Sequence, residues 1–246
     1  MHRVLTVSSF VLAGLLGCGS SSSDHASTTP ATTSAAPAPS GDITTQAEQQ
    51  AMTPAEVIAD LKAGNARFVR GETTPRDHLA QVKGTAAGQY PKAVVLSCLD
   101  SRVPAELVFD QGIGDLFVAR VAGNFENEDI LGSMEFATAA AGSKAIVVLG
   151  HTSCGAIKGA CDGVELGNLT ATLANIAPAI AASQGVPGEH TSKNHAYVHA
   201  VTEANIDQTV RDITERSPVL KDLVDKGALT VVGALYDLET GQVTWR

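Results

Sequence analysis

Short apolar runs alternate with segments of helical spacing through the centre of the chain. The runs lie at residues 93–96, 116–119 and 145–149, and helix-like patterns near 104–110 and 130–142 separate them. Wholly apolar runs of this length are typical of strands that are buried on both faces. Because strands and helices alternate, the pattern predicts a parallel sheet with helices on both of its faces.

The same kind of pattern continues on both sides of this region. Thr53, Pro54 and Glu56 have the arrangement of a capping box with proline in the first turn of a helix. The apolar spacing extends that helix to about Arg70. The other predicted elements are mostly helical stretches at 169–183 and 196–225, a strand at 229–235, and a turn at 239–241 that leads into an antiparallel strand at 243–245. The predicted fold class is α/β, with a mostly parallel central β-sheet flanked by helices and an antiparallel edge strand.

The first fifty residues differ in composition from the rest. Residues 1–17 contain one Arg and then an apolar stretch too short to span a bilayer permanently, which is typical of an export signal. The stretch ends in Leu-Leu-Gly-Cys, an order that resembles the bacterial lipobox and predicts lipidation of Cys18. The alternative is an ordinary signal peptide with an incidental cysteine. Ser, Thr, Ala and Pro dominate from residue 19 to about residue 50, as in a tether.

These boundaries predict a lipoprotein signal peptide over 1–17, the lipidated cysteine and a linker over 18–50, and a folded domain over 51–246. We expect an exported protein, held by its lipid on the periplasmic or extracytoplasmic face of a bacterial cell envelope. The 17 Lys and Arg residues face 26 Asp and Glu residues and form no basic run, so the chain lacks the electrostatic footprint of a nucleic-acid-binding protein. Membrane attachment would therefore depend on the acyl chains alone.

Two short motifs carry the candidate chemistry. Four cysteines in 246 residues are too few for a disulfide scaffold, so each is interpreted from its neighbours. CLDSR at 98–102 and HTSCG at 151–155 each follow a predicted buried strand, and the carboxyl ends of parallel strands meet in one crevice. Cys98, His151 and Cys154 offer two thiolates and an imidazole, which suit zinc and leave a fourth position open. The alternative is two buried cysteines that pack as small apolar side chains beside a hydrogen-bonded histidine.

CLDSR followed about fifty residues later by HTSCG resembles the β-class carbonic anhydrases. The resemblance runs from Met52 to about Val243, and it includes GNARF at 64–68, DQG at 110–112, RVAGN at 120–124 and VGA at 232–234. It implies that 51–246 is a catalytic domain in which Cys98, His151 and Cys154 bind one Zn²⁺ per subunit. The implied reaction is the reversible hydration of CO₂ to bicarbonate and a proton, by attack of zinc-bound hydroxide.

Asp100 and Arg102 are the candidate catalytic pair. Two thiolates cancel the formal charge of zinc, so help from neighbouring residues is expected. Asp100 is suited to accept the hydrogen of the hydroxide, and Arg102 can hold that carboxylate ionised through a bidentate pair. The alternative is an ordinary surface ion pair. In some members of the family the same Asp becomes the fourth zinc ligand, and both states remain open for this sequence.

The resemblance also implies a set of substrate-binding residues. Gln89, nine residues before the first cysteine ligand, is the candidate hydrogen-bond donor. The remaining candidates are the pocket walls Phe117, Ala122 and Phe136, and Gly155 with its backbone N–H near the reacting atoms. Two residues depart from the family pattern: Phe136 stands where a Tyr is usual, and Val121 where an Asn is usual. For the phenylalanines the alternative is an ordinary place in the core.

The resemblance implies a homodimer or a dimer of dimers, with the cleft at the subunit interface. Two other functions fit the same residues. One is hydrolysis of carbonyl sulfide or carbon disulfide, and the other is a non-catalytic lipoprotein that binds zinc or senses thiols. Asp100, Arg102 and Gln89 speak against storage or sensing, because neither task needs a base or a substrate donor. Cys161 is expected to be a buried small side chain rather than a fourth ligand.

Overall fold

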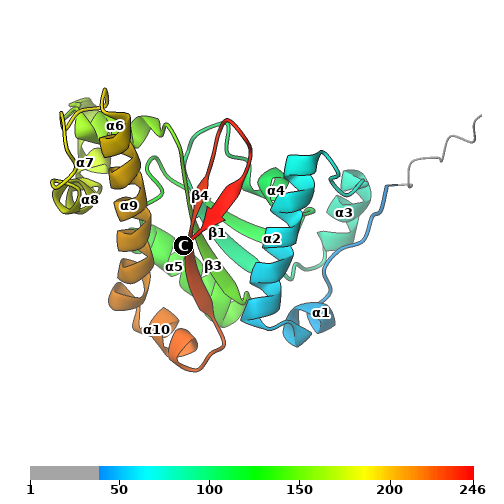
Figure 1. Cartoon of the computed structure of the whole chain (residues 1–246). Coiled ribbons are helices and arrows are strands. Elements are labelled where there is room, and N and C mark those ends of the chain that lie inside the picture. The colour runs from blue at the N-terminus through cyan, green and yellow to red at the C-terminus, as the bar shows by residue number, and fades with distance from the viewer. Residues whose placement is uncertain (1–38) are drawn as a thin grey trace, which may run out of the picture. The chain divides into compact units, whose positions relative to one another are not determined.

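The computed structural model describes residues 39–246, and its centre is a five-stranded sheet (Figure 1). The strands are β1 (Ala93–Ser97), β2 (Leu116–Arg120), β3 (Ala145–His151), β4 (Thr230–Tyr236) and β5 (Val243–Trp245). Their order is β2-β1-β3-β4-β5. The first four strands pair in parallel, and β5 pairs antiparallel with β4. The predicted α/β fold and its antiparallel edge strand are confirmed.

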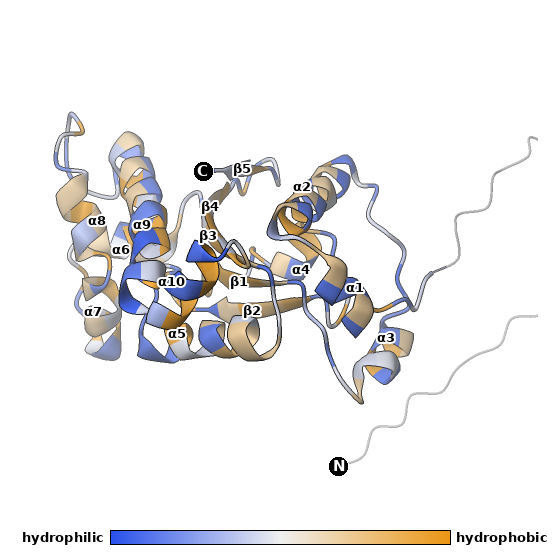
Figure 2. Cartoon of the chain, turned by 90° about the horizontal axis from the view of Figure 1, so that it is seen from below, coloured by the Kyte–Doolittle hydropathy of each residue, from blue (hydrophilic) through white to orange (hydrophobic). Residues whose placement is uncertain are grey.

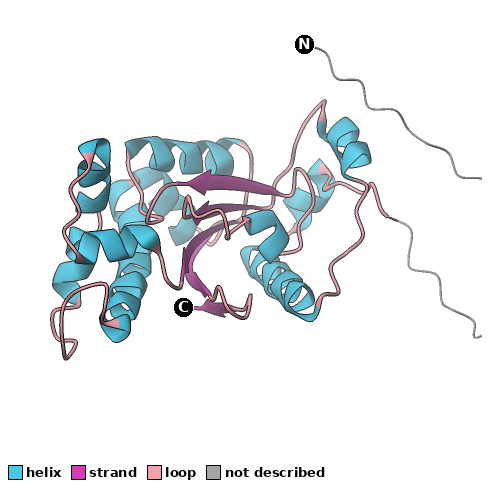
Figure 3. Cartoon of the chain, turned by 90° about the horizontal axis from the view of Figure 1, so that it is seen from above, coloured by secondary structure: helices cyan, strands magenta, loops and turns pink. Residues whose placement is uncertain are grey.

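Helices cover both faces of this sheet (Figure 3). They are α1 (Gln46–Ala51), α2 (Pro54–Arg70), α3 (His78–Thr85), α4 (Ala105–Val108), α5 (Glu128–Glu135), the π-helix η1 (Phe136–Ala140), α6 (Gly155–Cys161), α7 (Gly167–Ala174), α8 (Ala177–Ala182), α9 (His195–Arg216) and α10 (Pro218–Asp225). Figure 1 shows α2 and α9 on opposite sides of the sheet. Among the described helices, none combines the length and the apolar character needed to cross a bilayer.

Successive side chains of the central strands enter two separate cores. In β1, Ala93 and Val95 pack with α2 and α4, while Val94 and Leu96 pack with α5, α9 and α10. Alternation of this kind follows from the two-residue period of a strand. Both faces are buried, which explains why these strands are wholly apolar in the sequence and stand out at the centre of Figure 2.

The predicted start of α2 is confirmed in detail. The Thr53 side chain accepts from the N–H of Glu56, and the Glu56 carboxylate accepts from the N–H of Thr53. The helix ends at Arg70 and is capped by Gly71, whose φ of 69° lies in the left-handed region that favours glycine. The predicted helix near 130–142 begins two residues earlier, at Glu128, and its second half is the π-helix η1.

Helix α1 lies in the part of the chain that composition assigns to the linker. A second capping box, between Thr45 and Glu48, starts it. The buried Gln49 side chain then donates hydrogen bonds of 2.8 Å to the carbonyls of Pro91 and Ala141. The folded part therefore begins before residue 51, the predicted domain boundary. The many small and polar residues of this region conceal the short T-x-x-E signal.

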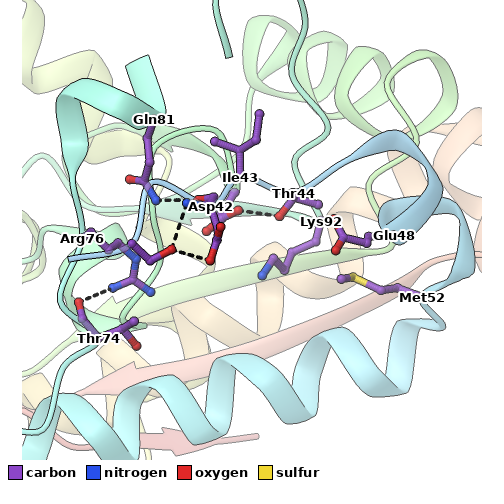
Figure 4. Close-up of a pocket in the computed structure, with 11 residues that line it drawn as sticks. Asp42, Ile43, Thr44, Glu48, Met52, Thr74, Arg76, Gln81 and Lys92 are labelled. Carbon is purple, nitrogen blue, oxygen red and sulfur yellow. Dashed lines mark hydrogen bonds between the residues drawn. The ribbon is translucent and has the colours of Figure 1, made fainter. Parts of the chain in front are cut away.

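The segment before α1 is attached to α3 and to the loop that precedes it. Ser40 pairs with this loop through the carbonyl of Pro75, and Gln81 donates to the carbonyl of Asp42 at 2.9 Å. Thr44 Oγ1 donates to Asp115 at 2.5 Å. A pocket of about 350 Å³ lies along this seam (Figure 4). Polar side chains that line this pocket form hydrogen bonds between the segment and the domain. These bonds attach the segment to the domain.

Candidate metal centre

The three predicted metal ligands converge at the carboxyl ends of β1 and β3. Cys98 follows β1, His151 is the last residue of β3, and Cys154 immediately precedes α6. All three are buried, and their ligand atoms lie within 4.8 Å of one another. The two Sγ atoms are 3.8 Å apart. Two zinc–sulfur bonds of about 2.3 Å at a tetrahedral angle would separate the sulfurs by about 3.8 Å, so the spacing fits zinc.

The imidazole of His151 is oriented for the same point. Its Nδ1 lies 2.9 Å from the carbonyl of Thr152, which fixes Nδ1 as the protonated nitrogen. Nε2 is then left with a lone pair, and it is buried with no hydrogen-bond partner within residues 39–246. Buried polar atoms rarely remain unpaired. A nitrogen of this kind, facing two sulfurs, has the chemistry of a metal ligand.

The backbone between the two ligands of the second motif is bent to bring them together. Ser153 has a φ of 53°, in the left-handed region that residues other than glycine seldom adopt. This conformation turns the chain within the three-residue step from His151 to Cys154. The unusual backbone conformation of Ser153 therefore helps to bring the two ligand side chains together.

The two thiols share their ionisation. A hydrogen bond from Cys154 lowers the pKa of Cys98, and the same contact together with burial raises the pKa of Cys154. The N–H of Gly123, in the turn after β2, also donates to Cys98 Sγ at 3.4 Å. One thiolate is thus stabilised, and a proton stays on the other sulfur. A bound dication would displace that proton, as expected for a thiolate metal site.

Asp100 and Arg102 form the bidentate pair that the sequence predicts. Arg102 Nε donates to Oδ1 of Asp100 at 2.9 Å, and Nη2 donates to Oδ2 at 2.6 Å. The backbone N–H of Arg102 adds a third bond to Oδ1 at 2.9 Å. These bonds hold the pKa of Asp100 well below its usual range. Oδ2 lies 3.8 Å from Nε2 of His151, so an ionised carboxylate borders the ligand set.

The predicted substrate-binding residues fall into two places. Ala122 precedes Gly123, and Gly155 follows Cys154, so both lie beside the metal ligands. We call the other three, Gln89, Phe117 and Phe136, the distal group. Gln89 precedes β1, whereas the metal ligand Cys98 follows it, and β1 is about 16 Å long. One chain therefore does not bring Gln89 to the metal centre.

The two phenylalanines of the distal group lie on the edge strand. Phe117 pairs in register with Val94, near the start of β2, and Phe136 packs edge-to-face against it at 6.2 Å between ring centroids. Phe136 is 60% exposed, so the core alternative does not describe it. The two rings border a groove of about 760 Å³ along β2 and α5. They too lie away from the metal ligands of their own chain.

Sequence reasoning missed one contributor to the centre, Arg120. Its guanidinium donates to main-chain carbonyls of the first motif. The RVAGN segment marks it only as part of a resemblance, because carbonyl acceptors belong to every residue and leave no sequence signal. Cys161 is partly buried, less than predicted, and it lies outside the cluster of three ligands found among the described residues.

Comparisons with known proteins point to one family. The family described as "Carbonic anhydrase" matches residues 93–243. The chain is 36% identical over 192 residues to "Carbonic anhydrase 2" of Mycobacterium tuberculosis, which covers 76% of this chain and 89% of that protein. It is 32% identical over 199 residues to a "Carbonic anhydrase" of Pseudomonas aeruginosa, with 76% and 86% covered.

Solved structures agree with this match. The crystal structure of the β-carbonic anhydrase CafA of Aspergillus fumigatus superposes with a TM-score of 0.60 at 25% identity, covering 78% of this chain and 89% of that one. The β-carbonic anhydrase CcaA gives a TM-score of 0.59 at 25% identity, covering 77% and 87%. Fold, clustered ligands and relatives agree, and the chain belongs to the β-class carbonic anhydrases.

Proposed function

We propose that this carbonic anhydrase hydrates CO₂ reversibly at a zinc ion held by Cys98, His151 and Cys154, with Asp100 as the orienting base. The observation that carries the proposal is the meeting of two sulfurs, an unpaired buried nitrogen and an ionised carboxylate at one point. Bound zinc supplies a Lewis acid that lowers the pKa of a coordinated water to about 7.

The two oxygens of the Asp100 carboxylate have different roles. Oδ1 accepts from both Nε and the backbone N–H of Arg102, which fixes its orientation. Oδ2 accepts one bond from Nη2 and has its other lone pair available on the side of His151. That oxygen is placed to accept a hydrogen from the attacking nucleophile and so to direct a lone pair at the carbon of CO₂. The side chain of Arg102 is 57% exposed, and its two side-chain hydrogen bonds to Asp100 help to keep the carboxylate ionised.

Asp100→Asn tests this role. The amide keeps the shape but offers weaker acceptance towards the nucleophile, so kcat for CO₂ hydration should fall by about 10²–10³-fold with one zinc per chain retained. Stopped-flow hydration and metal analysis measure the two quantities. Asp162→Asn, which changes an exposed acid bonded to Ser192, is the matched control and should keep full activity. An Asp100→Asn enzyme with wild-type kcat would refute the proposal.

The same measurements separate the alternatives. A zinc-loaded wild-type protein that releases sulfide from carbonyl sulfide or carbon disulfide, but does not hydrate CO₂, would favour the sulfur substrates. A protein that binds zinc and turns over neither kind of substrate would favour storage or sensing.

We propose further that a second copy of this chain brings its distal group to the metal centre. Among the strands that the structure describes, β2 has one neighbour, β1, so none of them pairs with its outer edge. Exposed apolar side chains lie close to this strand: Phe136 at 60%, which packs on Phe117, and Ile113 at 39%, three residues before β2. Two β2 edges that pair across a two-fold axis perpendicular to the strands run antiparallel. The start of one β2, with Phe117, then lies towards the end of the other, where Cys98 is found. A homodimer, alone or paired again, would complete both sites.

For the N-terminal segment we propose export and lipid anchoring at Cys18 on the bacterial cell envelope. The support is the composition of residues 1–50 alone, because Cys18, the signal peptide and most of the linker lie outside the described residues. Fractionation of cells that express wild-type protein and Cys18→Ser tests it. The wild type should partition with membranes and the variant should not. A Cys18→Ser protein that stays with membranes would contradict lipid anchoring.

A further inference from the structure

We infer that Arg120 is a positioning residue for the reaction: its guanidinium fixes the main chain that carries both the metal ligand Cys98 and the base Asp100. The inference rests on the proposed role of Asp100. Arg120 is the last residue of β2, the strand next to β1. Its side chain crosses to the segment that follows β1, and it touches neither the ligand atoms nor the carboxylate in any recorded hydrogen bond among the described residues.

Three consecutive carbonyls meet this one side chain. Nε donates to the carbonyl of Cys98 at 2.9 Å, and Nη2 donates to the carbonyl of Leu99 at 3.3 Å. Nη2 also donates to the carbonyl of Asp100. A guanidinium presents its N–H groups as a rigid planar fork, so it can hold several acceptors in one fixed arrangement. Hydrogen bonds from a charged donor are also stronger than neutral ones.

The segment needs an outside support because the sheet ends just before it. The registers of β1 with β2 and with β3 both stop at Ser97. A last backbone bond, from the N–H of Leu99 to the carbonyl of Val121, measures 3.3 Å. The side chain of Leu99 is 67% exposed, so it gives the segment no apolar anchor between Cys98 and Asp100. The carbonyl of Asp100 also accepts from the N–H of Val103 at 3.1 Å, so the support from Arg120 matters most for the carbonyls of Cys98 and Leu99.

Arg102 and Arg120 thus act on different parts of the same residue. Arg102 holds the carboxylate of Asp100, whereas Arg120 holds its main chain. Only Leu99 stands between Cys98 and Asp100 in the sequence, so the path of this main chain decides where the carboxylate lies relative to the sulfur. Displacements of about 1 Å at a reacting group can cost about 10²-fold in rate. Positioning by Arg120 should therefore affect the rate of the reaction more than the binding of zinc or substrate.

The test compares Arg120→Ala, Arg120→Gln and Arg120→Lys with the wild-type enzyme. We expect kcat of Arg120→Ala to fall by about 10- to 100-fold, with KM and zinc content unchanged. Arg120→Lys keeps a charged donor and should recover part of the loss, and added guanidinium should partly rescue Arg120→Ala. With cobalt in place of zinc, the visible spectrum of Arg120→Ala should shift, because the path of the main chain at Cys98 has changed. Arg211→Ala, which removes an exposed arginine bonded to Gln208, is the control for losing a surface charge.

Several results would overturn the inference. One is an Arg120→Ala enzyme with kcat within about twofold of the wild type. Another is a loss of activity that follows lost zinc or a lowered melting temperature and that neither lysine nor guanidinium rescues. If Arg120→Ala does not fold, Arg120→Lys and Arg120→Gln are compared instead, and Arg120→Lys should have the higher kcat because it keeps a charged donor. Equal kcat values for these two variants would count against positioning. A wild-type enzyme without CO₂ hydration would instead refute the proposed function, so the two failures are distinguishable.

Discussion

The metal cluster, formed by Cys98, His151, Cys154 and the Asp100–Arg102 pair, and the distal group differ in how much one chain supplies. In the metal cluster the ligands are buried, and the protein around them orients each one. The distal group lies beyond the other end of β1 and along the open edge of β2, where Phe136 is mostly exposed. One chain therefore brings the metal ligands and the proposed base together, whereas the proposed substrate-facing side chains would reach this centre only from a second copy.

The largest effect is expected at the metal cluster itself. Cys98→Ser replaces a thiolate by a hydroxyl that is a poor zinc ligand at neutral pH, so zinc should be lost and CO₂ hydration should fall by at least about 10³-fold. Cys161→Ser is the matched control, since this thiol lies outside the cluster, and it should keep zinc and activity. Metal analysis and stopped-flow assays report both. A Cys98→Ser enzyme that still hydrates CO₂ would contradict the assignment of Cys98 as a zinc ligand.

The next effect concerns the open edge of β2. Phe136→Arg and Ile113→Arg each place a charge at an exposed apolar position close to β2, so under the proposed dimer both should release monomers and lower kcat/KM by about 10- to 100-fold with zinc retained. Ile113 is not a predicted pocket residue, which separates loss of assembly from damage to the pocket. Leu166→Arg changes an exposed apolar side chain in the loop before α7 and should alter neither mass nor activity.

Solution mass and steady-state kinetics on the same samples provide the measurement. A wild-type chain that is monomeric and fully active would show that the distal group is not needed, and the two regions would then be independent.

The contrast also marks what the sequence could predict. Strands and metal ligands carry local signals: apolar runs reveal β1 and β3, and the motifs directly after them hold Cys98, His151 and Cys154. The position of Gln89 relative to these ligands follows only from the direction and length of β1. A resemblance transfers a residue's role, but it does not state which copy of the chain provides the residue.

Other features could not be predicted from the sequence, for a different physical reason. Arg120 and Gln49 bind main-chain carbonyls that lie 20 to 92 residues away along the chain. Every residue offers such an acceptor, so no side-chain pattern identifies the partner. Only the assembled fold shows that Arg120 supports the metal-binding segment and that Gln49 attaches α1.

A moderate effect on stability is expected at Asp110, which belongs to neither region. Its buried carboxylate accepts hydrogen bonds from Arg67, Arg76 and Thr74 and so joins α2 to the loop before α3. Asp110→Asn should lower the free energy of unfolding by about 2–3 kcal/mol, with zinc content and mass unchanged. Urea unfolding of the variant and the wild type measures the difference.

This difference should depend on pH with a definite sign. Burial alone would raise the pKa of Asp110, but hydrogen bonds from Arg76, Arg67 and Thr74 outweigh burial and leave the pKa below its usual value. The stabilisation is then complete above the unfolded-state pKa of about 3.9 and is lost as the pH falls through the folded-state value. The wild type and Asp110→Asn should converge on acidification. A gap that widens at low pH would contradict the assignment.

The smallest effect is expected at Gln49, which binds main-chain carbonyls close in sequence to Gln89 and Phe136 of the distal group. Its side chain holds the carbonyl of Pro91, two residues after Gln89, and that of Ala141, just after η1. Gln49→Ala leaves both carbonyls without this donor and should cost about 1–2 kcal/mol of unfolding free energy, while zinc content stays at the wild-type level. Gln50→Ala, at the exposed neighbouring position, should have no measurable effect. If α1 belongs to the folded domain, Gln49→Ala should unfold at a lower temperature than Gln50→Ala. Equal melting temperatures for the two variants would show that residues 46–50 do not stabilise the domain.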